Sequence, residues 1–200
     1  MTINKVIFTR TLFFLRSEYF NISFDSDTQK NGSGGIFSVG IKFPEVSILK
    51  GQFQMGVKYF TPEDPAASKY SKPNGSGNVS FRLTKRFKLG FSYEIDNYYS
   101  YFEPDQYFDL RRYTVGLDYY MGRNIKAGYS FSAGETVYRK LAGEDTGRID
   151  RIEQSDLRLG VRISGNMEFG IRYTRYFGRS SFYEFTRNYN FIGGYINHEF

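Results

Sequence analysis

The amino-acid sequence predicts an all-β fold, a closed antiparallel up-and-down β-barrel of about ten strands. Three observations predict it: apolar and polar residues alternate along most of the chain, short and long connections alternate, and aromatic residues make up 20% of the composition. The alternation is clearest in residues 157 to 175, where apolar side chains occupy every second position on both sides of the break Ser164-Gly165-Asn166. This pattern predicts two antiparallel strands joined by a tight turn, each with one apolar and one charged face.

The remaining strands follow from the same period of two, which is typical of a strand and not of a helix. Short and long connections alternate between them, so an up-and-down meander places all short turns at one rim and all long loops at the other. The predicted strands lie within residues 10–24, 37–43, 49–59, 79–84, 88–96, 112–119, 125–132, 157–163, 167–173 and 187–200. The predicted long loops lie near residues 25–35, 61–77, 100–110, 138–150 and 178–186.

Residues 1–200 are interpreted as a single β-barrel domain, or as the C-terminal part of a larger barrel, because no Pro/Ser-rich linker divides the sequence. Cysteine is absent, which excludes a disulfide framework and a thiolate metal site. No run of about 18 apolar residues exists that would predict a transmembrane helix. Arg10 and Arg16 interrupt the apolar N-terminal stretch, which makes it a poor signal peptide.

The strand faces indicate that the apolar side faces lipid, so the predicted barrel is transmembrane. Strands of about 10 to 14 residues suit the length needed to cross a bilayer at a tilt, whereas soluble strands usually have about 5 or 6. Tyrosines such as Tyr98, Tyr107 and Tyr119 gather at strand ends and are interpreted as girdles at the membrane interfaces. Glycines recur on the charged face, where they relieve crowding inside a small barrel. These glycines are Gly40, Gly56, Gly90, Gly116, Gly128, Gly160 and Gly170.

The C-terminal residues resemble the assembly signal of Gram-negative outer-membrane β-barrel proteins. Ile192, Gly194, Ile196 and His198 occupy alternate positions before the terminal aromatic residue Phe200. The whole chain is similar to that class in pattern, without a diagnostic internal motif. The resemblance implies a location in the bacterial outer membrane, contact with its lipid and lipopolysaccharide, and recognition by the outer-membrane assembly machinery. We expect a monomer.

The sequence offers little catalytic chemistry, so no catalytic residue, metal site or cofactor is predicted. The single histidine, His198, lies on the predicted turn rim, away from the long loops, which argues against a histidine-based triad. The loop acids Glu103, Asp105 and Asp109 do not match the spacing of an EF-hand calcium loop. Nucleic acid is not an expected partner, because the aromatic residues follow strand ends and do not line a continuous basic groove.

The charged strand faces are interpreted as a ladder of ion pairs that fills the lumen. Acids interleave with more numerous bases on neighbouring strands, which favours a ladder over a two-carboxylate glycosidase site. The excess of bases, in a chain of net charge +6, predicts that any current through the lumen favours anions. The predicted ladder consists of Arg82, Glu94, Asp96, Arg112, Asp118, Lys126, Arg158, Arg162, Glu168 and Arg172.

Basic residues in or near the long loops are either a solvated surface or contacts for lipopolysaccharide phosphates. They are Lys69, Lys72, Arg139, Lys140, Arg148, Arg151, Arg179 and Arg187.

The predicted function is that of a structural, adhesive or narrow anion-favouring pore protein with a largely filled lumen, and not that of an enzyme. Two alternatives stay open: a soluble β-barrel or sandwich that binds an apolar ligand, and the C-terminal portion of a larger export porin.

Overall fold

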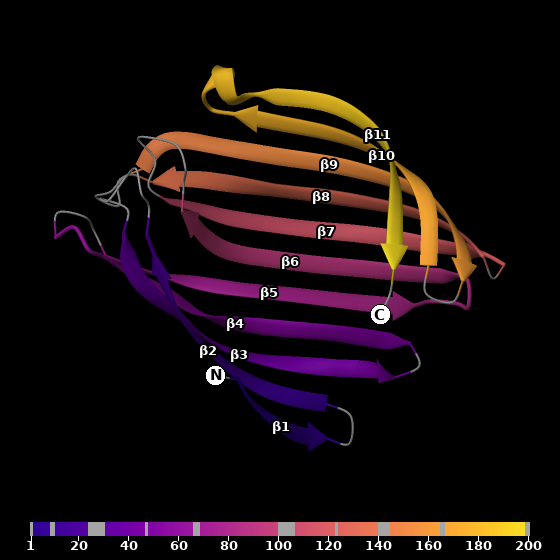
Figure 1. The fold of residues 1–200 in the computed structure, drawn as a ribbon, viewed down its shortest axis with the longest axis horizontal. Coiled ribbons are helices and arrows are strands. Elements are labelled where there is room, and N and C mark those ends of the chain that lie inside the picture. Colours follow the sequence, from indigo (N-terminus) through magenta and orange to yellow (C-terminus); the bar gives the residue numbers. More distant parts are fainter. Residues whose placement is uncertain are drawn as a thin grey trace.

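A computed structural model describes residues 2–8, 11–23, 31–46, 48–65, 69–99, 107–122, 124–139, 145–164 and 167–198. These residues form one antiparallel sheet in which each strand pairs with the next in sequence (Figure 1). A short 3-10 helix, η2 (Tyr183–Phe185), precedes the last strand. The strands are β1 (Thr2–Phe8), β2 (Thr11–Ile22), β3 (Gly32–Val46), β4 (Leu49–Pro62), β5 (Tyr70–Arg82), β6 (Phe87–Tyr99), β7 (Tyr107–Met121), β8 (Ile125–Arg139), β9 (Asp145–Ser164), β10 (Met167–Ser180) and β11 (Arg187–His198).

The all-β, up-and-down architecture predicted from the sequence is confirmed. Figure 1 shows the short connections together at one end of the sheet, here called the turn end, and the longer ones at the opposite, loop end. Local side-chain chemistry supports the tight turns: the Thr84 hydroxyl accepts hydrogen bonds from the backbone N–H groups of Arg86 and Phe87, and Gly122 has a φ of 70°. The described strands number eleven, in agreement with the predicted count of about ten; the additional strand is β1, which pairs with β2 ahead of the first predicted strand.

The long loops are shorter than predicted, most clearly before β5. That strand begins at Tyr70, inside the stretch 61–77 that the sequence predicts to be a loop. Pro73, Gly75 and Gly77 have low strand propensity, but the segment pairs with β4 along its whole length, from Tyr70 to Phe81. Cross-strand pairing therefore overrides local propensity at this site.

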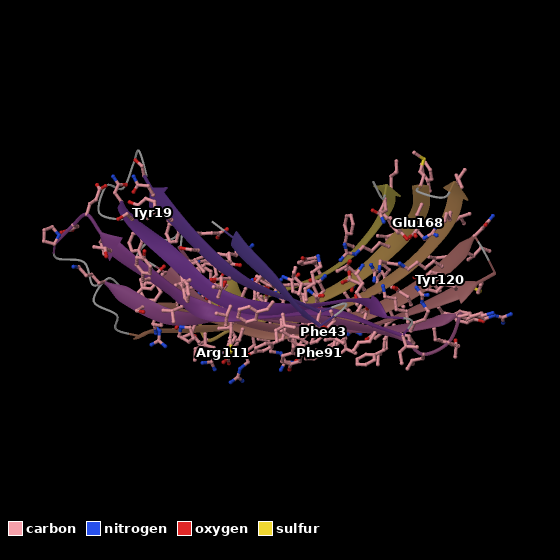
Figure 2. All side chains as sticks on the ribbon, turned by 90° about the horizontal axis from the view of Figure 1, so that it is seen from below. Tyr19, Phe43, Phe91, Arg111, Tyr120 and Glu168 are labelled. Atoms are coloured by element: carbon pink, nitrogen blue, oxygen red, sulfur yellow. The ribbon has the colours of Figure 1, made fainter. Side chains whose placement is uncertain are left out.

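The ladder register separates the residues into two faces. Opposed residues on neighbouring strands point to the same face, as does every second residue along a strand. Phe91 lies opposite Val115, which in turn lies opposite Phe131. Figure 2 shows Phe91 on the convex face of the curved sheet and Glu168 on the concave face. The apolar positions therefore cover the convex face, and the charged positions of the strand pattern cover the concave face.

The convex face exposes many large apolar side chains. Leu159, Val161 and Ile171 are 45%, 47% and 60% exposed, respectively. Soluble monomers rarely expose apolar surface on this scale, whereas membrane barrels direct such a band toward lipid. Because the concave face is charged, the alternative of a soluble barrel with an apolar interior is not supported.

The strands β5 and β6 separate at the loop end. Their ladder runs from Arg82 and Lys88 only as far as Gly75 and Ile95, and Figure 1 shows the two strands diverging beyond that point. Pro73 lies in the part of β5 that has no pairing with β6; it lacks a backbone N–H, which suits a strand edge. Among the described residues no ladder joins β1 to β11, so closure of the sheet into a barrel stays a prediction.

Aromatic side chains form the main buried cluster, at the loop end. Phe60, Tyr70 and Tyr107 are 3%, 8% and 5% exposed, and Phe20 packs against them. The interpretation of Tyr107 as a girdle residue is therefore wrong, because its ring stacks on Tyr70 with centroids 4.8 Å apart. Where the structure describes the chain, it contains no helix with the length and apolar character needed to cross a membrane.

Candidate functional site

All ten residues of the predicted charge ladder lie on the concave face. Glu168 lies opposite Arg162, and Glu94 lies opposite Arg112. Asp96 and Lys126 share this face because they alternate with apolar positions on β6 and β8. One row of opposed residues crosses the sheet through Arg82, Lys88, Asp118, Gly128, Arg158 and Arg172.

Ion pairs join neighbouring strands in the middle of this face. The Asp118 carboxylate lies 3.5 Å from Lys126 Nζ and 3.9 Å from Arg158 Nη2. Arg172 Nη2 lies 2.6 Å from Asp156 Oδ1, and Asp156 also accepts a hydrogen bond of 2.6 Å from the Thr174 hydroxyl. Asp156 is only 5% exposed, so these donors stabilise a carboxylate that is largely removed from water.

The ladder is incomplete. Arg112 and Arg162 face Glu94 and Glu168 in the register, yet neither arginine forms an ion pair with an acid in the described part of the chain. Glu168 instead accepts a hydrogen bond of 2.7 Å from the Tyr195 hydroxyl. Sequence periodicity assigns a residue to a face, but it does not determine which neighbour the side chain reaches.

A second group of charges lies at the loop end, where β5 and β6 diverge. Lys58 Nζ lies 3.1 Å from Asp96 Oδ1, and their side chains are 13% and 23% exposed. The Asp109 carboxylate lies 3.5 Å from both Lys72 Nζ and Arg139 Nε. Lys72 and Arg139, predicted as lipopolysaccharide contacts, are therefore paired to an internal acid.

The surroundings of Asp109 do not suit a calcium ion. Its carboxylate is neutralised by two cations, and it also accepts a hydrogen bond of 2.5 Å from the Asn97 amide. Glu103 and Asp105 lie outside the described residues. Among the residues that are described, no group of three or more His, Asp or Glu side chains is arranged to hold a metal ion.

Aromatic rings line the concave face at the loop end, a feature that the sequence analysis did not find. Phe108 lies between Tyr98 and Tyr138, with ring centroids 5.5 Å and 5.6 Å away. The Arg148 guanidinium lies 4.0 Å from the Tyr138 ring centroid and 3.7 Å from that of Phe185. Arg148 is 7% exposed, which leaves little of it open to the predicted lipopolysaccharide contact, and that contact stays a prediction. The sequence does hold a signal for this lining: Tyr98, Phe108 and Tyr138 occupy even-numbered positions of β6, β7 and β8, which are the positions of the charged face.

The turn end of the concave face carries a cluster of cations. A cavity of about 320 Å³ there is lined by several basic side chains and by Tyr120, and no acid is among its described lining residues. Arg82 and Lys88 lie directly opposite each other in the ladder, an arrangement in which like charges repel. The basic residues of this cavity, here called the turn-end cluster, are Lys50, Arg82, Lys85, Lys88 and Arg162.

The remaining predicted residues lie elsewhere. Arg187 lies opposite Gly178, which places it on the concave face, whereas Arg151 and Arg179 lie on the convex face. Lys69 is exposed beside the start of β5, and Lys140 lies outside the described residues.

Ile192, Gly194 and Ile196 of the predicted assembly signal lie on the convex side of β11. The side chain of His198 and all of Phe200 lie outside the described residues, so recognition by the assembly machinery stays a prediction.

No protein-family model and no curated protein matches the chain. Among solved structures, the FrpB iron transporter from Neisseria meningitidis (F3-3 variant) is 11% identical with a TM-score of 0.60, and the match covers 90% of this chain and 34% of that one. The apoprotein form of the F5-1 variant matches with the same identity and TM-score over 35% of its length. The NanC porin matches at 10% identity over 100% of this chain and 97% of its own, with a TM-score of 0.49.

These likenesses define a class of fold. The chain has the fold of the outer-membrane β-barrel proteins, as its resemblance to that class implies. It spans about a third of the length of the FrpB transporters that it matches.

Proposed function

We propose that the protein is a β-barrel of the bacterial outer membrane whose lumen is a narrow, anion-favouring passage. The observation that carries this proposal is the turn-end cluster, in which five basic residues and no acid line one cavity on the concave face of the described chain. Basic side chains that line a constriction favour anions over cations. The apolar convex face and the outer-membrane fold support the location.

The rest of the concave face supports a narrow lumen. Ion pairs around Asp118 and Asp156 bridge neighbouring strands in the middle of the sheet. At the loop end, aromatic rings and the Lys58–Asp96 pair take up further space. We therefore expect a small single-channel conductance, because little of the lumen is left open to solvent.

A charge reversal in the turn-end cluster tests the proposal. In planar bilayers with a salt gradient, Arg162→Glu is expected to move the reversal potential toward cation selectivity, because it places an acid among the cations. The matched control is Arg111→Glu, since Figure 2 shows Arg111 on the convex face, outside the lumen. Unchanged selectivity in Arg162→Glu, or an equal shift in Arg111→Glu, would contradict the proposal. Correct insertion without any current would leave a structural or adhesive role.

A second candidate is an arc of a wider barrel, completed by further strands or by other subunits. It is favoured by the fit to about a third of each FrpB chain at a TM-score of 0.60. Light scattering of the refolded protein in detergent distinguishes the two cases. One chain per particle with a small conductance supports the narrow barrel, whereas several chains with a large conductance support the wider one.

A further inference from the structure

We propose that the convex face carries a binding site for the phosphorylated headgroup of an outer-leaflet glycolipid. The site consists of Arg151 on β9 with Arg175 and Arg179 on β10. The proposal rests on the outer-membrane location proposed above, because only there does such a lipid meet this face. It is separate from the lumen and from the turn-end cluster.

The register places all three arginines on the convex side of the sheet. Arg111 projects from the convex face in Figure 2 and lies opposite Glu135. Glu135 lies opposite Arg151, and Arg151 lies opposite Arg179. Arg175 occupies the same side of β10, because it is four residues from Arg179.

Two of the arginines line a hollow in the convex face, and the third lies beside it. A cavity of about 400 Å³ is lined by Arg151 and Arg179, with apolar walls from Ile149 and Phe177. The Arg175 guanidinium lies 4.5 Å from the centroid of the Phe177 ring, which restricts its orientation. Arg151 and Arg179 thus line one depression that is large enough for a phosphate group, and Arg175 adjoins it through its contact with Phe177.

The charges in this hollow are unbalanced. Arg151 and Arg179 are directly opposed, an arrangement that destabilises the sheet unless an anion lies between them. Within the described chain, none of the three arginines forms an ion pair with an acid; the carboxylate that lines the cavity belongs to Glu153. Arg111 differs in this respect, because its Nη1 lies 3.6 Å from Glu135 Oε1. Two arginines and one carboxylate line the hollow, Arg175 lies beside it, and Glu135 opposite Arg151 is paired with Arg111; the remaining excess of positive charge suits a phosphate group.

The position along the strands indicates a lipid source for that phosphate. Toward the turn end, the same face of β9 and β10 exposes Leu157 and Ile171, which are 52% and 60% exposed. The arginines begin on the loop side of this apolar surface. In outer-membrane barrels the long loops face the cell exterior, so the arginines lie at the height of the outer-leaflet headgroups. A lipid seated there places acyl chains on the apolar surface and phosphates on the guanidinium groups.

Lipid titration of the refolded protein in detergent tests the site. The probes are bisphosphorylated lipid A, dephosphorylated lipid A and inorganic phosphate, and bound lipid is counted by native mass spectrometry. The double variant R151S/R179S is expected to weaken binding of bisphosphorylated lipid A by about tenfold or more, since two charge-assisted contacts are lost. The matched control R111S removes a convex arginine that already has an acidic partner, and binding is expected to stay within about twofold of the wild type.

The outcomes separate this site from the proposed pore. Equal binding of dephosphorylated lipid A, or equal losses in R151S/R179S and R111S, would overturn the site. Saturation by inorganic phosphate at the same concentrations would overturn the lipid assignment in favour of a free-phosphate site. Ion selectivity in planar bilayers is expected to be unchanged in R151S/R179S. Failure of the pore proposal would therefore appear in the selectivity measurement, and failure of the lipid site in the binding measurement. If the double variant does not refold, the single variants R151Q and R179Q provide the same comparison with smaller losses.

Discussion

The two ends of the sheet hold their charges in different ways. At the loop end, Lys58 meets Asp96, and Asp109 meets Lys72 and Arg139, among packed aromatic rings. At the turn end, the five basic residues of the turn-end cluster share a cavity without an acid in the described chain. The same residue types therefore stabilise the structure at one end and create a positive potential at the other.

The neighbours of a charged side chain, and not its face alone, decide whether it stabilises the sheet. Partly buried ion pairs with good geometry resist removal of either partner, because the remaining charge stays unpaired away from water. Where cations repel one another, the removal of one of them lowers the stability of the protein only slightly. The change in the free energy of unfolding should therefore be larger for substitutions at the loop end than for substitutions at the turn end.

The largest expected difference concerns aromatic packing. Tyr107→Ala should lower the free energy of unfolding by about 3 to 5 kcal/mol, because it removes a 5% exposed ring that stacks on Tyr70. Tyr120→Ala at the turn end should cost about 1 kcal/mol or less, since Tyr120 borders an open cavity. Denaturant unfolding in lipid vesicles measures both. Similar losses would show that the loop-end cluster is not the better packed region.

A smaller difference is expected for charge removal. Asp109→Asn should destabilise the protein by about 2 kcal/mol, because Lys72 and Arg139 lose their shared partner in a partly exposed site. Lys88→Gln should change stability by about 0.5 kcal/mol or less, because Lys88 lies opposite both Arg82 and Asp118 and the repulsion from one offsets the attraction to the other. The same unfolding experiment measures both, and a loss in Lys88→Gln as large as that in Asp109→Asn would contradict the distinction between the two ends.

The smallest expected difference concerns two glycines on the concave face. A Cβ at Gly34 would lie 2.6 Å from the Phe20 ring and would clash with the Tyr59 carbonyl oxygen, so Gly34→Ala should cost about 1 to 3 kcal/mol. At Gly90 the nearest atom would be 3.9 Å away, and Gly90→Ala should change stability by about 0.5 kcal/mol or less. Comparable losses in unfolding experiments would show that the turn end is as crowded as the loop end.

Much of the fold could be predicted from the sequence, because the side-chain period of a strand is a local property. The alternation in residues 157 to 175 predicts β9, β10 and their two faces, and the structure has both. The start of β5 could not be predicted, since Pro73 and Gly75 disfavour a strand locally and only the pairing with β4 stabilises it.

The site was predictable in part for a similar reason. Periodicity places the ladder residues on one face, but ion pairs depend on where neighbouring strands diverge. The divergence of β5 and β6 is what lets Lys72 on β5 reach Asp109 on β7, two strands away in the sheet. The sequence also places Tyr107 at a strand end, which suggests a girdle residue, but it gives no sign of the stacking partner Tyr70 on β5.

One measurement tests the contrast between the two ends most directly. The chain has no cysteine, so a single cysteine placed at Ser80 or at Ser76 reports the local potential through its rate of reaction with anionic and cationic thiol reagents. Both serines lie on the concave face of β5; Ser80 lines the turn-end cavity with Lys50, whereas Ser76 lies opposite Glu94 toward the loop end. The ratio of anionic to cationic rates is predicted to be about tenfold or more higher at Ser80 than at Ser76, and to fall as salt is added. Equal ratios at the two positions, or a higher ratio at Ser76, would contradict the account.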